Sequence, residues 1–208
     1  AKPRPKHNYL AMGCEDGTVA VHQISFSTVH GLYRDRYAYR ENMTDVVVQN
    51  LLSEQKVRIK CRDCVKLIAM YKNRLAVQLT DRVIIYEVEN ARDSGNMSYR
   101  GFTKIPQKLD CNLLVVTSHH FLLCLEKKLQ IYTFHGVKER EWNLDSVIRY
   151  IKVIGGPRRR ESILVGLKNG LVLKIFINNP FPVELVKHPV GVRCLDLSAS
   201  RHKLAVVD

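Results

Sequence analysis

The sequence has 208 residues, of which 46% are apolar and 25% are charged. This length and composition allow a well-packed core and exclude a disordered tail. The longest apolar runs, such as residues 113–116, are far too short to cross a bilayer, so we expect a soluble chain without a transmembrane segment. The 33 Lys and Arg residues outnumber the 20 Asp and Glu residues, and the resulting charge of +13 favours acidic partners. Six cysteines at low density indicate reduced thiols.

One sequence unit recurs from end to end: an apolar strand, a tight turn and a second apolar strand. This unit predicts a β-hairpin, because Asp-Gly and Asn-Gly pairs tolerate the positive φ angles of tight hairpin turns. No window shows a sustained helical period, so we predict an all-β fold. The predicted hairpins lie at residues 10–21, 75–86, 121–132 and 163–175, and a fifth begins at 204–208.

The spacing of the turns predicts a β-propeller. One position in each turn, namely Asp16, Asp81, Lys127, Asn169 and Asp208, recurs at intervals of 65, 46, 42 and 39 residues. WD-type propellers repeat at about 40–45 residues, with four strands in each blade. A sandwich or a barrel would place strands at about 8–12 residues without the longer period. We therefore predict a WD-type β-propeller with about five degenerate blades, since the Trp-Asp and Gly-His signatures are absent.

The sequence is expected to hold only part of the ring. It starts on the inner strands of one blade and stops inside another, so we expect sequence outside this chain to complete the ring. Residues 1–208 are predicted to belong to one β-propeller domain. The first interval exceeds the period by about 20 residues, which predicts an insertion near residues 25–56. Further strands are expected at 57–60, 65–69, 140–144, 150–154, 183–186 and 192–195.

Two basic segments are candidates for partner binding. In residues 32–40, tyrosines are interleaved with arginines. Three roles fit such side chains: they form hot spots of a protein interface, they stack on bases, or they pack over a propeller edge. Residues 158–160 form an Arg run at a predicted loop tip, which would contact an acidic partner or lipid headgroups, or stay solvated. The candidate partner-binding residues are Tyr33, Arg34, Arg36, Tyr37, Tyr39, Arg40, Arg158, Arg159 and Arg160.

No motif predicts catalysis, a cofactor or a metal. The P-loop, nucleophile-elbow and HExxH patterns are absent from the sequence. Cys61 and Cys64 have zinc or redox spacing, but no second pair follows and no βαβ context surrounds them. We interpret these cysteines as strand residues, one of them buried. His119 and His120 would point to opposite faces of a strand and could not chelate together.

Several longer runs resemble the WD-repeat subunits of the intraflagellar transport A complex, and in particular a second propeller of that family. The resemblance extends over roughly residues 8–208. It rests on residues 30–40, 54–61, 136–142, 149–157, 165–170 and 193–201.

The resemblance implies a non-catalytic scaffold on the cytoplasmic side of the cilium, the flagellum and the ciliary base. Such a subunit would support retrograde transport, the entry of membrane proteins into the cilium, and so cilium assembly. The implied partners are other subunits of the complex and ciliary membrane cargo adaptors. Because the chain carries excess positive charge, we also expect a weak contact with anionic lipid. Nucleic acid is not expected as a partner. The alternative is a basic propeller that binds nucleic acid or anionic membrane directly.

Overall fold

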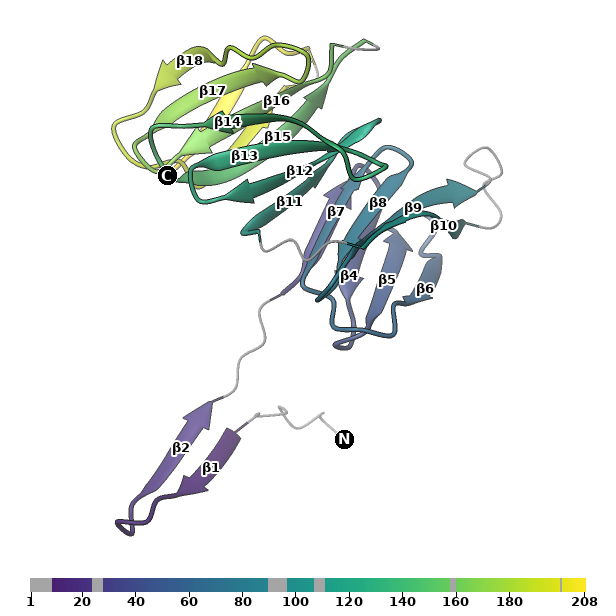
Figure 1. Cartoon of the computed structure of the whole chain (residues 1–208), viewed down its shortest axis with the longest axis vertical. Coiled ribbons are helices and arrows are strands. Elements are labelled where there is room, and N and C mark those ends of the chain that lie inside the picture. The colour runs from purple at the N-terminus through teal and green to yellow at the C-terminus, as the bar shows by residue number, and fades with distance from the viewer. Residues whose placement is uncertain (1–8, 24–27, 90–96, 107–110, 158–159, 199) are drawn as a thin grey trace.

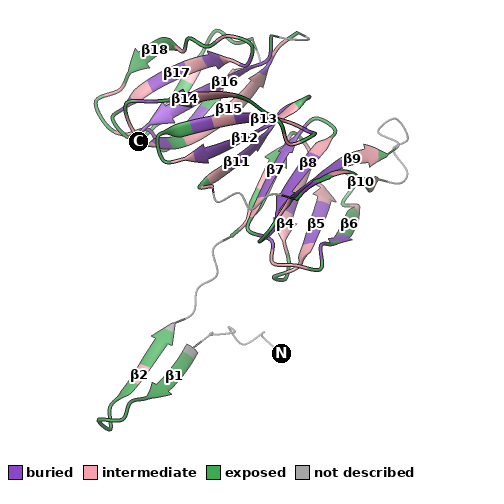
Figure 2. Ribbon diagram, viewed as in Figure 1, coloured by how far each residue is buried: buried purple, intermediate pink, exposed green. Residues whose placement is uncertain are grey.

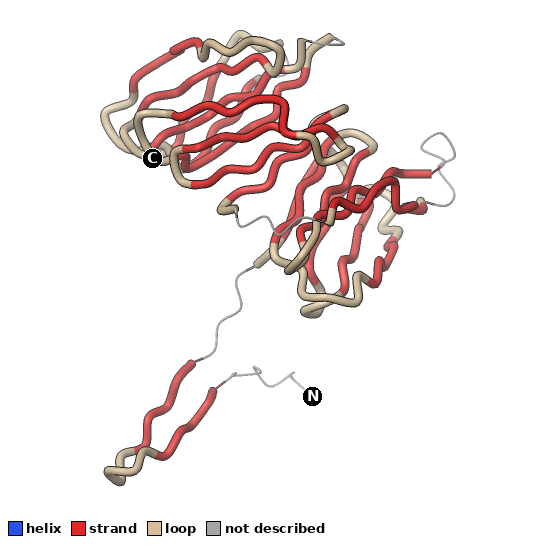
Figure 3. The backbone as a smooth tube through the Cα atoms, viewed as in Figure 1, coloured by secondary structure: helices blue, strands red, loops and turns tan. Residues whose placement is uncertain are grey.

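The computed structural model describes residues 9–23, 28–89, 97–106, 111–157, 160–198 and 200–208. The described residues form β-strands, turns and loops without a helix (Figure 3). No segment of this described part therefore supplies a helix that could span a membrane. The all-β prediction is confirmed.

Four antiparallel sheets of four strands each follow one another along the chain, and each sheet is a simple meander. The strands of the first two sheets are β3 His30–Tyr33, β4 Arg36–Arg40, β5 Asp45–Asn50, β6 Lys56–Lys60, β7 Leu67–Tyr71, β8 Arg74–Gln78, β9 Val83–Glu89 and β10 Ser98–Ile105. Those of the next two are β11 Leu113–Val116, β12 His120–Leu125, β13 Lys128–Thr133, β14 Lys138–Asn143, β15 Ile148–Gly155, β16 Ser162–Leu167, β17 Leu171–Phe176 and β18 Val183–Lys187.

Two shorter sheets flank this series. At the C-terminal end, β19 Cys194–Leu197 pairs with β20 Leu204–Val207. At the N-terminal end, β1 Tyr9–Gly13 and β2 Val19–Gln23 pair only with each other and stand apart from the other sheets (Figure 1).

The first strand of each sheet lies innermost. Strand β3 lies against β7, β7 against β11, β11 against β15, and β15 against β19. The sheets therefore follow one another around a common axis, with their first strands nearest to it. This is the arrangement of a β-propeller, and the predicted fold class is confirmed.

The core lies between neighbouring sheets. One cluster joins β3–β6 to β7–β10, a second joins β7–β10 to β11–β14, and a third joins β11–β14 to β15–β18. An inner sheet is thus covered on both faces, and its second strand is apolar on both sides, as the buried run Ser162–Leu167 shows (Figure 2). This double burial explains the continuous apolar runs that mark the repeats in the sequence.

The last strand of each sheet is more polar than the strand before it, and three of these four last strands have an irregular register. Strands β10, β14 and β18 each contain a register shift against the preceding strand, and all five residues of β18 are exposed. Bulges and charged residues are common on edge strands, because they discourage pairing with other chains.

The predicted insertion near residues 25–56 is wrong. The segment contains β3, β4 and β5, which form a complete sheet together with β6. The long first interval therefore contains an additional blade. Strand β4, Arg-Tyr-Ala-Tyr-Arg, lacks the apolar run that begins the other hairpins, and the turn after it, residues 41–44, has no Asp-Gly or Asn-Gly pair, so the sequence pattern does not reveal this sheet.

Candidate partner-binding face

The turns between the first and second strands of the sheets gather at one end of the ring. Antiparallel strands alternate in direction, and the sheets are arranged alike, so equivalent turns point the same way. The turns between the third and fourth strands lie at the same end. We call this end of the ring the axial face. Arg34, Lys72, Ser118, Glu161 and Arg201 lie in five successive first turns of this face.

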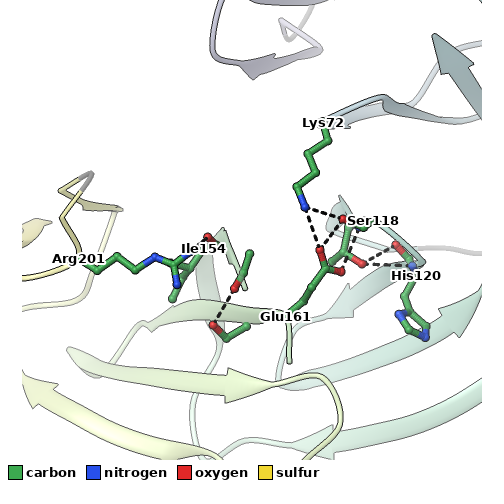
Figure 4. Close-up of polar contacts among 9 residues, drawn as sticks. Lys72, Ser118, His120, Ile154, Glu161 and Arg201 are labelled. Atoms are coloured by element: carbon green, nitrogen blue, oxygen red, sulfur yellow. Dashed lines mark hydrogen bonds and ion pairs between the residues drawn. The ribbon is translucent and has the colours of Figure 1, made fainter. Parts of the chain in front are cut away.

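A polar network joins three of these turns (Figure 4). Glu161 is only 5% exposed, and its side chain is held by polar partners. Its carboxylate accepts hydrogen bonds from the Ser118 backbone N–H at 3.2 Å and from the Ser118 hydroxyl at 2.5 Å. The Lys72 ammonium lies 3.7 Å from the same carboxylate and 3.0 Å from the Ser118 hydroxyl. Burying a carboxylate is costly unless it is paired, so this network favours one placement of the three sheets.

Two tyrosines pack beside this network at the ends of β3 and β7. The Tyr33 and Tyr71 rings meet edge to face, with 5.1 Å between their centroids. Burial raises the pKa of Tyr71 to about 12, the Glu161 carboxylate adds to the rise, and Arg201 and Arg34 oppose it. Gly155 has a φ of +75°, and a Cβ there would overlap the Tyr71 hydroxyl. The turns of several blades therefore converge on Tyr71.

Three cations of the axial face occupy an unusual backbone conformation. The φ angles of Arg34, Lys72 and Arg201 are 54°, 49° and 61°. For residues other than glycine this left-handed region costs about 1–2 kcal/mol. A signal for these turns is present in the sequence, because residues 33–36 and 71–74 share the pattern Tyr, cation, Asp or Asn, Arg. This repeat lies outside the predicted hairpin units.

The predicted partner-binding residues divide between different parts of the molecule. Tyr33, Arg34 and Arg36 lie at or next to the axial face, and the Arg36 guanidinium donates to the Lys72 carbonyl of the next sheet. Exposed Arg160 lies on the same face, whereas Arg158 and Arg159 lie outside the described residues.

The remaining predicted residues lie along β4. The rings of Tyr37 and Tyr39 stack with 5.5 Å between their centroids. Arg40 lies at the opposite end of the strand from Arg36, and its guanidinium donates to the Val65 carbonyl at 2.8 Å. These contacts give Tyr37, Tyr39 and Arg40 packing roles. Partner binding by any of the nine residues stays a prediction.

The cysteine and histidine pairs do not form a metal cluster. Among the described residues, no group of three or more His, Cys, Asp and Glu side chains could hold a metal ion. Cys61 is buried beside the Tyr86 hydroxyl, 3.8 Å from its sulfur, and burial raises the pKa of its thiol. His120 has a separate role, since its Nε2 lies 3.1 Å from the Glu139 carboxylate.

The radial sheets and the polar turn face define the class of this protein as a β-propeller with WD-type blades. Solved structures share this fold at low sequence identity. A chain from the crystal structure of BBS1N in complex with ARL6DN has a TM-score of 0.61 and 18% identity, over 90% of this chain and 65% of that one. Kluyveromyces lactis Hsv2 has a TM-score of 0.60 and 11% identity, over 86% and 56% respectively.

The chain belongs to the family of the second β-propeller of intraflagellar transport protein 122, because the model of that family, "IFT122 second beta-propeller", matches residues 30–208. Intraflagellar transport protein 122 homologs are 62% identical in Xenopus tropicalis and 60% identical in Homo sapiens, over 205 residues. Those alignments cover 99% of this chain but only 17% and 16% of the two relatives. Residues 1–29 fall outside the family match, so their membership of the same domain stays a prediction.

Proposed function

We propose that this propeller is part of a non-catalytic scaffold subunit of the intraflagellar transport A complex. The identity of 62% with an intraflagellar transport protein 122 homolog, over nearly the whole chain, is the observation that supports this proposal most strongly. At that identity, the packing between blades and the surface turns are expected to be largely shared.

The proposed role is support of retrograde ciliary transport and of the entry of membrane proteins into the cilium. A propeller suits this role, since its turns and edge strands offer several separate surfaces on one rigid body. The proposed partners are other subunits of the complex and adaptors for membrane cargo, and the proposed location is the cilium and its base.

Affinity purification of the tagged full-length protein from ciliated cells tests this function. We expect other subunits of the complex to co-purify in near-stoichiometric amounts, because scaffold interfaces are large and stable. The matched control is the same protein without residues 30–208. Recovery of the intact protein from cilia without any other transport subunit would contradict the proposal.

A second readout tests the transport role. Cells that lack the protein should accumulate transport material at ciliary tips, and the full-length protein should reverse this. Normal return of material from the tip in such cells would rule out a role in retrograde transport.

A further inference from the structure

A groove opens on the axial face between the sheet β11–β14 and the sheet β15–β18. Its main part is a cavity of about 600 Å³ lined by His120, Glu139, Arg140, Glu161, Ile177 and Asn178. A second hollow of about 400 Å³ shares Asn178 and continues along the β17–β18 turn past Arg160 and Pro180. Ligand sites commonly have volumes of about 300–1,000 Å³, so the groove has room for a few residues of extended chain.

The acidic side chains of the groove are already paired. The Glu161 carboxylate is bound by Lys72 and Ser118, and the Glu139 carboxylate lies 3.1 Å from Nε2 of His120. Glu161 therefore presents no uncompensated negative charge to a ligand, whereas His120 compensates the charge of Glu139 only when its imidazole is protonated.

The two guanidinium groups of the groove lack such compensation. Arg140 donates to the Ile177 carbonyl at 3.0 Å and lies over the Trp142 ring. Within the described part of the chain, none of the ion pairs includes Arg140 or Arg160. Guanidinium groups bind carboxylates through paired N–H donors, so the groove favours an acidic ligand.

One exposed apolar side chain lies beside the groove. Phe181, in the turn before β18 and next to the lining residue Pro180, is 74% exposed. The Trp142 indole N–H donates to the Pro180 carbonyl at 3.0 Å, which holds this turn against the neighbouring sheet. A preformed groove with an exposed apolar side chain beside it is typical of a protein-binding site.

We propose that this groove binds a short extended segment of a partner protein, in which acidic residues flank an apolar anchor. The anchor packs against Phe181, and the carboxylates reach Arg140 and Arg160. Arg140 lines a hollow, which a narrow segment enters and a flat membrane surface does not. The role of such a partner in transport rests on the proposed function, whereas the binding site rests on the groove alone.

Fluorescence anisotropy with synthetic peptides and the purified full-length protein tests the site. The probe is the labelled peptide GDDLFEDG, and its comparisons are the basic peptide GKKLFKKG and the anchorless peptide GDDGSEDG. We expect saturable binding of the probe, about tenfold weaker binding of the anchorless peptide, and none of the basic peptide. Raising salt from about 50 to 150 mM should weaken the binding.

Matched variants locate the binding. Arg160→Glu and Phe181→Ser change exposed side chains of the groove, and each should weaken probe binding about tenfold. Lys168→Glu and Val190→Ser change exposed side chains at the opposite end of the ring and should leave binding unchanged.

Three results would overturn the proposal. The first is equal binding of the acidic and basic peptides, and the second is equal effects of the groove variants and the control variants. The third is that the protein does not bind the probe peptide but does bind vesicles of phosphatidylcholine with about 30% phosphatidylserine. The last result would assign the face to a membrane. Co-purification with transport subunits is scored separately, so failure of the peptide site leaves the proposed function standing.

Discussion

Lys72 combines a local backbone cost with a long-range gain. Its φ of 49° lies in the region that glycine tolerates best, while its ammonium neutralises the buried Glu161 of another sheet. Glu54 has a similar φ of 59° but is exposed in the β5–β6 turn. Comparing the two residues therefore distinguishes the free-energy cost of the positive φ angle, which both have, from the stabilisation by the ion pair, which only Lys72 provides.

Replacing each of these residues by glycine should give different outcomes. Lys72→Gly relieves the turn but leaves the Glu161 carboxylate with only its Ser118 hydrogen bonds, so we expect a net loss of about 1 kcal/mol in unfolding free energy. Glu54→Gly should change the unfolding free energy by no more than about 0.5 kcal/mol, because relief of the turn offsets the greater entropy of the unfolded chain. Urea unfolding followed by circular dichroism measures both values. Equal losses in the two variants would contradict a role for the ion pair.

At the scale of elements, neighbouring sheets are joined by side chains that reach across the gap. Trp142 of β14 is 4% exposed and donates to Pro180 in the β17–β18 turn. Its ring packs in the cluster that joins β11–β14 to β15–β18. These two sheets should therefore unfold together.

Trp142 is the sole tryptophan of the chain and reports on that interface. In the 208-residue chain we expect tryptophan fluorescence and far-ultraviolet circular dichroism to give the same urea midpoint. Trp142→Phe should lower the unfolding free energy by about 1–2 kcal/mol through the lost hydrogen bond. Trp142→Ala should lower it by about 3–5 kcal/mol through the cavity it leaves. Val137→Ala, in the exposed turn before β14, is the control for these variants. A urea midpoint by fluorescence well below the midpoint by circular dichroism would show that the two sheets around Trp142 unfold separately from the rest.

At the scale of the whole molecule, cations lie in turns at both ends of the ring. Arg34, Lys72 and Arg201 lie on the axial face, whereas Lys127 and Lys168 lie in turns at the opposite end. Nucleic-acid binding generally requires cations along one continuous surface. The distribution of charge therefore favours discrete acidic partners over a long polyanion.

A titration with single-stranded RNA checks this expectation. With a labelled 20-nucleotide RNA at about 150 mM salt, we expect no saturable binding below about 10 µM protein. Any binding at low salt should be weakened about equally by Arg160→Glu and Lys168→Glu, because it would be non-specific. Tight binding with a steep salt dependence that only one variant abolishes would show a nucleic-acid surface.

The all-β class, the blade period and most of the inner hairpins could be predicted from the sequence. Strands such as β12 and β16 are buried on both faces, so their apolar runs are continuous, and Asn169-Gly170 marks the turn after β16. Strands β3–β5 escaped prediction, since the tyrosines and arginines of β4 surround a small buried residue, Ala38, and leave no apolar run before the middle turn of the sheet.

The sequence by itself determined the blades, because each blade is a local meander whose strands and turns are close along the chain. Only the tertiary structure decided which turns share a face, since that depends on how successive sheets pack around the axis. This packing brings Lys72, Ser118 and Glu161 together from three sheets, and it opens the groove beside Arg140. No local pattern encodes those contacts, because each one joins residues on different blades.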